Sequence, residues 1–148
     1  MTDPLPRTGR LLAIDWGEVR LGLALSDETQ TIASPLETLV RRPGKRFPMP
    51  RFLELIALHA PAGIVVGLPL TPGGDEGPSA VAARELGQLV ARRTGLPVSW
   101  WDERMSTARA LATIQEQGGS TRGRKADVDA LAAAILLQHF LSSRANTQ

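Results

Sequence analysis

Short apolar runs bounded by turn residues are the feature that most limits the fold of this chain. The first run covers residues 11–14 and the second covers residues 21–25, with a hairpin-length link between them. A weaker third run covers residues 31–39, where Pro35 favours an edge strand or a bulge. These three runs predict consecutive strands in an antiparallel meander.

Later apolar runs alternate with segments of helical spacing. Residues 64–66 and 98–101 predict two further strands. Helices are expected at residues 51–60, 80–94, about 107–117 and 127–141, with Gly95 as a helix stop. Strands joined through helices favour parallel pairing by right-handed crossovers. The predicted fold class is α/β, with a mixed five-stranded sheet flanked by helices in the layout of an RNase H-like domain.

Length and composition favour one globular domain. The chain has 148 residues and is 43% apolar, which suits a single domain. We expect a domain at residues 11–141, a flexible lead-in at 1–10 and a tail at 142–148. The absence of Cys excludes disulfides, thiolate zinc sites and a Cys nucleophile. No signal-peptide pattern and no apolar run near ~20 residues occur, so no membrane partner is expected and the cytoplasm is the expected compartment.

The net charge is weaker evidence for nucleic-acid binding than the basic pI suggests. The formal charge is only +2, and little titrates near neutral pH because there is no Tyr, no Cys and only two His. Fifteen of the 17 Lys and Arg residues are Arg. The planar guanidinium suits phosphate groups, although a GC-rich genome explains the same bias equally well.

Acidic residues follow two of the predicted strands and open the last helix. Asp15 comes directly after the first run, and Asp102 and Glu103 come after the fifth strand. Asp127 and Asp129 lie at the start of the final helix. Sites in open α/β sheets form outside the carboxyl ends of parallel strands. Asp15 and Glu103 therefore converge if the first and fifth strands point the same way.

Such a set of carboxylates predicts a particular chemistry. Carboxylates without thiols are hard oxygen ligands, which suit Mg²⁺ or Mn²⁺ rather than Zn²⁺. Two such ions ~3.5–4 Å apart hold a scissile phosphate and stabilise its attacking and leaving oxygens. Each acid also has an ordinary structural explanation: Asp15 begins a turn, Asp102 caps a helix, and Asp127 is a natural N-cap. Their joint placement favours a metal-dependent phosphoryl-transfer site.

Four segments occur in an order and spacing typical of one family. They are residues 12–27 (LAIDWGEVRLGLALSD), 64–70 (IVVGLPL), 102–107 (DERMST) and 125–138 (KADVDALAAAILLQ). Together they resemble the YqgF/RuvX family of bacterial RNase H-like nucleases, from residue 11 to about residue 141. The chain departs from the family pattern at residues 71–75, where members often carry an Asn, and at Asp127, where they often carry a basic or apolar residue.

The resemblance implies an RNase H-like fold and divalent-metal hydrolysis of phosphodiesters. The acidic residues of the family correspond to Asp15, Glu103 and Asp129, which are the expected catalytic metal ligands for Mg²⁺ or Mn²⁺. Asp102 is the second choice for Glu103, because neighbouring strand residues face opposite sides of a sheet. Asp127 is a candidate fourth ligand. Lys125 is a candidate catalytic residue that contacts phosphate or stabilises charge.

Basic residues near these motifs are candidates for contact with the nucleic-acid backbone. They are Arg20, Arg41, Arg42, Lys45, Arg46, Arg104, Arg122 and Arg124. An ordinary surface ion pair explains Arg104 equally well, and the two loop clusters are also consistent with solvated loops. The three Trp residues favour core packing over base stacking, although one of them can flank the cleft.

The resemblance implies two possible substrates. One is the 5′ leader of precursor 16S ribosomal RNA, and the other is a four-way DNA junction. Symmetric cutting of a junction requires two active sites and hence a homodimer. Sugar-kinase and actin-like ATPase domains share the layout, but they need a second domain for which this chain has no room. A non-catalytic nucleic-acid-binding or ribosome-assembly protein is the remaining alternative.

Overall fold

A computed structural model of the protein describes residues 4–42, 46–102 and 125–145, with side chains of the last segment described from Val128 on. Its centre is a five-stranded sheet with the spatial order β3-β2-β1-β4-β5. The strands are β1 (Leu11–Asp15), β2 (Arg20–Ser26), β3 (Ala33–Val40), β4 (Gly63–Leu68) and β5 (Val98–Asp102). β1, β2 and β3 pair antiparallel, while β4 pairs parallel with β1 and β5 parallel with β4. The predicted mixed sheet is confirmed.

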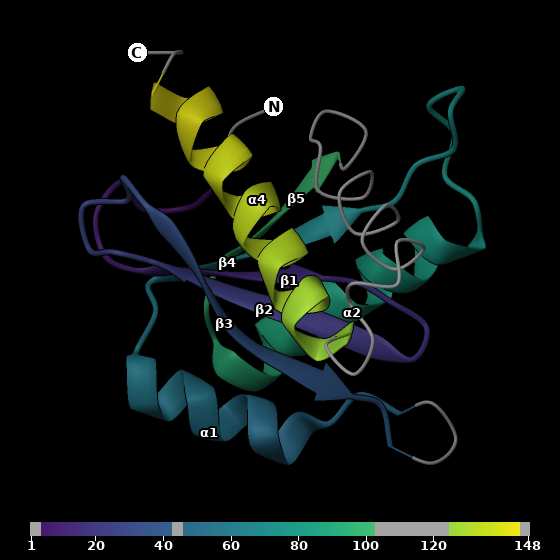
Figure 1. Ribbon diagram of the computed structural model, residues 1–148, viewed down its shortest axis with the longest axis horizontal. Helices are drawn as coiled ribbons and strands as arrows, with labels where there is room; N and C mark the ends of the chain where they lie inside the picture. Colours follow the sequence, from purple (N-terminus) through teal and green to yellow (C-terminus); the bar gives the residue numbers. More distant parts are fainter. Residues whose placement is uncertain (1–3, 43–45, 103–124, 146–148) are drawn as a thin grey trace.

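Helices cover both faces of this sheet. Helices α1 (Met49–His59) and α2 (Pro78–Thr94) pack on one face, and α4 (Lys125–Ala145) crosses the other (Figure 1). Because strand residues alternate between faces, β1 contributes to both apolar layers. Leu12 and Ile14 pack with α1 and α2, whereas Leu11 and Ala13 pack with α4. This double cover explains why β4 is buried along its whole length.

The edge strand β3 is tied to α4 by one amide side chain. Gln138 accepts a hydrogen bond from the Ala33 N–H at 3.0 Å and donates one to the Thr31 carbonyl at 3.0 Å. Further along β3, Pro35 lies beside a register shift between Leu23 and Ala24 of β2. Proline has no N–H to give to the ladder, so the predicted edge position and bulge both agree with the structure.

The two helices on the first face begin earlier than the sequence pattern predicts. α1 begins at Met49 and α2 at Pro78, rather than at residues 51 and 80. In each, proline occupies the first turn, where a missing N–H costs nothing and the fixed φ favours the helix. α2 ends before Gly95, which has the left-handed φ of 74° expected of a helix stop. The predicted helix near residues 107–117 lies outside the described residues.

The segment before β1 packs against the end of α4. This helix continues to Ala145, beyond the predicted end at residue 141. Arg144, only 8% exposed, donates hydrogen bonds to the carbonyls of Leu5 and Pro6 at 2.9 and 3.1 Å. Leu5 is itself 5% exposed and belongs to the apolar layer under α4. Across residues 4–42, 46–102 and 125–145, no helix has both the length and the apolar character needed to span a bilayer.

Candidate active site

Asp15 is the last residue of β1 and continues the row of side chains that faces α4. In this row Leu11 and Ala13 are fully buried, while Asp15 is partly exposed. Strand alternation therefore directs Asp15 to the α4 face of the sheet. β1, β4 and β5 run parallel and end at the same edge, which meets the condition for convergence of Asp15 and Glu103.

Gly22 of β2 pairs directly with Asp15 and is a position of close approach between α4 and the sheet. A Cβ atom at position 22 would lie 1.9 Å from the Asp129 carbonyl oxygen and 3.1 Å from the Ala130 nitrogen. Backbone atoms fill that space, so only glycine allows this approach. The contact places the Asp129 segment of α4 over the strand pair that carries Asp15.

An ion pair fixes the Asp129 carboxylate. The Arg20 Nε donates to Asp129 Oδ2 at 2.6 Å, and the two side chains are only 27% and 19% exposed. Arg20 and Gly22 are two residues apart on β2 and therefore share the α4 face. The sequence predicts a backbone phosphate contact for Arg20. In the structure this guanidinium binds a proposed metal ligand and balances its charge.

The side chains of β5 alternate between the two helical layers. Trp100 donates its indole N–H to the Ala83 carbonyl of α2 at 3.1 Å. Trp101 instead packs edge-to-face on Phe140 of α4, with ring centroids 5.7 Å apart. Asp102 follows Trp101 in the strand, so alternation assigns it to the α2 face, opposite to Asp15. This alternation disfavours Asp102 as a partner of Asp15.

Glu103, Lys125 and Asp127 are the remaining residues predicted for the site. Glu103 lies outside the described residues. Lys125 and Asp127 are in the first turn of α4, with side chains outside the described set. Asp127 is thus inside the helix and does not precede it as an N-cap. Among the residues that the structure describes, no three His, Asp or Glu side chains form a group that could hold a metal ion.

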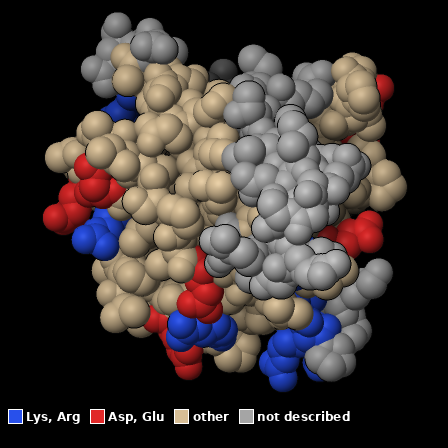
Figure 2. Space-filling view, in the orientation of Figure 1, with Lys and Arg blue, Asp and Glu red and all other residues tan. Residues whose placement is uncertain are grey.

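The structure describes four of the eight predicted basic residues, Arg20, Arg41, Arg42 and Arg46. Arg41 donates from Nε to the Gly17 carbonyl at 2.8 Å and stacks over Trp16, 5.5 Å from the ring centroid. Burial lowers the pKa of its guanidinium. Arg42 and Arg46 are exposed and joined by a backbone bridge. Lys45, Arg104, Arg122 and Arg124 lie outside the described residues. On the face of the molecule that Figure 2 shows, the described Lys and Arg lie in separate groups rather than in a continuous stripe.

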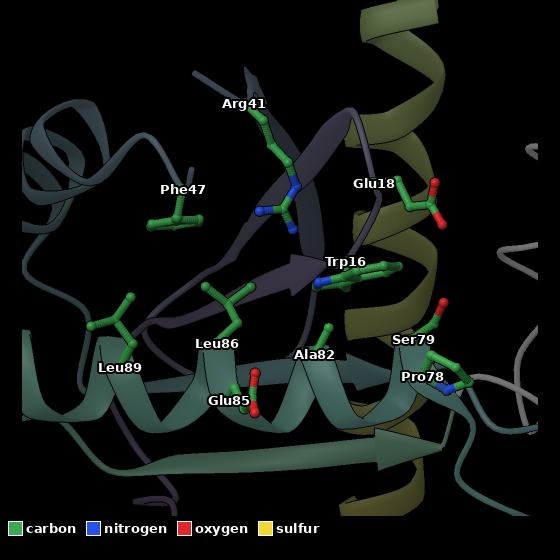
Figure 3. A pocket seen from close by; sticks show the side chains of 10 residues that line it. All are labelled: Trp16, Glu18, Arg41, Phe47, Pro78, Ser79, Ala82, Glu85, Leu86 and Leu89. Atoms are coloured by element: carbon green, nitrogen blue, oxygen red, sulfur yellow. The ribbon is translucent and has the colours of Figure 1, made fainter. Parts of the chain in front are cut away.

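A pocket of about 460 Å³ opens on the other face of the same sheet edge. Trp16 and Arg41 lie on its strand side, and Ala82, Leu86 and Leu89 of α2 form the opposite wall (Figure 3). The sequence pattern favours core packing for the three Trp residues and leaves open that one of them flanks a cleft, without indicating which one. The only available signal is alternation: if Asp15 faces one side of β1, Trp16 faces the other.

This architecture and the acidic edge define an RNase H-like protein with a RuvC-like fold. The chain is similar to Thermus thermophilus RuvC in complex with a Holliday junction substrate, with a TM-score of 0.57 and 23% identity, covering 93% of this chain and 96% of that one. A second Thermus thermophilus RuvC structure gives a TM-score of 0.55 and 24% identity, covering 93% and 97% of the two chains.

Sequence comparison gives the family. The RuvX family model, described as a Holliday junction resolvase, matches residues 9–143, so the chain belongs to the RuvX family. A Paramagnetospirillum magneticum relative is 38% identical over 140 residues, covering 95% of this chain and 90% of the relative. An Anaeromyxobacter relative is 41% identical over 135 residues, covering 91% and 98%. Both relatives are named "Putative pre-16S rRNA nuclease". The resemblance read from the four sequence segments is therefore confirmed.

Proposed function

We propose that the protein is a divalent-metal-dependent endonuclease that hydrolyses nucleic-acid phosphodiesters at the edge carrying Asp15. The observation that carries this proposal is the packing of the Asp129 segment on Gly22, directly opposite Asp15. Two acids far apart in the sequence are thereby held on one face of the sheet. Membership of the RuvX family supports the same activity.

The residues at this edge fit a hard divalent cation. Asp15 and Asp129 offer carboxylate oxygens, the ligands that Mg²⁺ and Mn²⁺ prefer. Glu103 is proposed from the sequence as the third ligand, and Asp127 is the candidate fourth ligand. When bound there, a pair of such ions would stabilise charge on the attacking and leaving oxygens of the phosphodiester. This two-metal arrangement is part of the proposal.

Residues around the acids have supporting roles in this scheme. Arg20 holds the Asp129 carboxylate in one orientation through the 2.6 Å ion pair. Lys125, in the first turn of α4, is proposed to stabilise charge on the phosphate. The exposed Arg42 and Arg46 are proposed to contact the backbone of the substrate away from the scissile bond.

The name shared by the relatives favours the precursor 16S rRNA leader as the substrate. Because the family is described as a Holliday junction resolvase, the four-way DNA junction is tested as well. A cleavage assay should offer both substrates and a linear duplex, in Mg²⁺ and separately in Mn²⁺. We expect the wild type to cut the RNA leader. Asp15→Asn, Glu103→Gln and Asp129→Asn should each lose at least about a hundredfold in rate.

Asp102→Asn is the matched control, because it removes a neighbouring carboxylate that alternation assigns to the other face. It should keep most of the activity. Loss of cleavage in Asp102→Asn with an active Glu103→Gln would overturn the ligand assignment. A wild type that binds these substrates but cuts none would favour the non-catalytic binding protein. Junction cleavage by a dimer, measured with its mass in solution, would favour DNA as the substrate.

A further inference from the structure

The pocket beside Trp16 has a chemistry different from that of the acidic edge. Its walls are mostly apolar and include Phe47, Leu86 and Leu89. The Trp16 indole nitrogen and the Arg41 guanidinium face into it (Figure 3). Glu18 and Glu85 add two carboxylates to the lining, and Ser79 adds a hydroxyl group. The pocket therefore offers apolar surface, N–H donors and carboxylate acceptors together.

This combination matches a neutral, flat, polar-edged group better than a phosphate. The lining holds two carboxylates and one guanidinium, and this negative balance disfavours an anion. Apolar walls favour an aromatic ring, and the volume of about 460 Å³ lies within the range of small-molecule pockets. The polar atoms at the edge of such a ring can then meet the donors and acceptors.

Guanine has the edge that fits best. Its O6 and N7 atoms accept hydrogen bonds from arginine, as Arg41 could supply. Its N1–H and amino group present adjacent donors, to which a carboxylate such as Glu85 can accept in a bidentate manner. Uracil lacks the amino group and offers a carboxylate only a single N–H. The lining therefore favours guanine over uracil.

The pocket also lies close to the proposed scissile position. Trp16 directly follows Asp15, and consecutive Cα atoms are about 3.8 Å apart. Their side chains face opposite sides of the sheet edge. A nucleic-acid strand that passes over this edge can therefore place a phosphate at Asp15 while an unpaired base of the same strand enters the pocket.

We propose that the pocket lined by Trp16, Arg41, Phe47 and Glu85 binds an unpaired nucleobase of the substrate, with guanine preferred. This proposal rests on the proposed function for the identity of the substrate, whereas binding of a nucleobase at the pocket does not depend on it. Base recognition gives the enzyme a contact that favours single-stranded over fully paired nucleic acid near the cut. It also gives a sequence preference that the acids cannot provide.

The test is ¹⁵N NMR of the Trp indole N–H signals in EDTA, with the Trp16 signal assigned from Trp16→Phe. GMP, UMP and ribose 5-phosphate are titrated separately. GMP should shift the Trp16 signal in a saturable way, UMP should shift it less, and ribose 5-phosphate should not shift it. Equal shifts from ribose 5-phosphate and GMP, or equal affinity for UMP and GMP, would overturn the guanine assignment, as would no shift with any nucleotide.

A matched pair of variants on α2 tests the location. Ala82→Leu adds volume inside the pocket, and Val81→Leu adds it on the exposed side of the same helix, where Val81 is 49% exposed. Ala82→Leu should weaken GMP binding about tenfold, the scale of one stacked base, and Val81→Leu should not. Equal effects would refute the site. Because EDTA prevents metal-dependent cleavage, this result and the cleavage result can fail independently.

Discussion

Replacing Gly22 with Ala tests whether one close backbone contact assembles the acidic edge. The added Cβ would lie 1.9 Å from the Asp129 carbonyl oxygen, whereas real contacts of this kind essentially never fall below 3.0 Å. Both neighbours are backbone atoms, so no side-chain rotation can relieve the overlap. Helix α4 must move away from the sheet until the gap reaches at least 3.0 Å.

The expected cost follows from two opposing effects. Alanine restricts the unfolded chain more than glycine, which alone would stabilise the protein by about 0.5–1 kcal/mol. Overpacking of a tight interior contact costs about 1–3 kcal/mol, and a backbone clash belongs at the upper end of that range. We therefore expect a net loss of about 2 kcal/mol. For a chain of this size, that lowers the Tm by roughly 4–8 °C.

The effect on catalysis should exceed the effect on stability. The shift of α4 moves Asp129 away from Asp15 by about an ångström, and a misplacement of that size can cost about a hundredfold in rate. Cleavage should be measured at 25 °C, where the folded variant predominates, and stability by thermal denaturation. Gly73→Ala is the control, because its added Cβ meets nothing closer than 3.7 Å. A Gly22→Ala protein with normal Tm and normal cleavage would refute the reasoning.

Three further outcomes are expected. Arg20→Met should lower the free energy of unfolding by about 1–2 kcal/mol in EDTA. A double-mutant cycle with Asp129→Asn, measured by urea unfolding, should show that the two losses of stability are coupled. Additive losses would contradict a stabilising Arg20–Asp129 ion pair. Arg144→Met should lower the free energy of unfolding by about 2–3 kcal/mol and speed tryptic cleavage of the segment before β1, because the variant loses the hydrogen bonds to the Leu5 and Pro6 carbonyls. An unchanged rate of proteolysis would argue against this role of Arg144. The Ile32 N–H and neighbouring donors lower the pKa of Asp27, so its charged form stabilises the fold above about pH 4 and that stability is lost as the pH falls further. Urea unfolding of Asp27→Asn should therefore show a smaller loss between about pH 5 and 3 than the wild type, and parallel curves would disprove this.

The sheet could be predicted from the sequence because its signals are local. Each strand is a short apolar run, and the number of residues between runs separates hairpins from crossovers. The position of Asp15 at a strand exit follows from the same pattern. Helix starts were less predictable, since Pro50 and Pro78 suit a first helical turn as well as a loop.

Long-range contacts could not be predicted in the same way. Arg20 and Asp129 are 109 positions apart, and nothing local indicates that an arginine after a turn will pair with a helix acid rather than a phosphate. The role of Gly22 also depends on α4, because a glycine in a strand has several possible causes. The pocket beside Trp16 required knowledge of which helix covers each face of the sheet.

The alternation of β1 connects the two proposed sites. Asp15 ends β1 on the α4 side, and Trp16, the next residue, packs against the opposite apolar layer, as continued alternation would place it. A one-residue slip of β1 would exchange their faces, placing an indole under α4 and a carboxylate against α2. The buried pairs Leu11 with Ala13 and Leu12 with Ile14 oppose that slip, because each fits the apolar layer on its own side. The register that buries the core is therefore the same register that separates proposed phosphate chemistry from proposed base recognition.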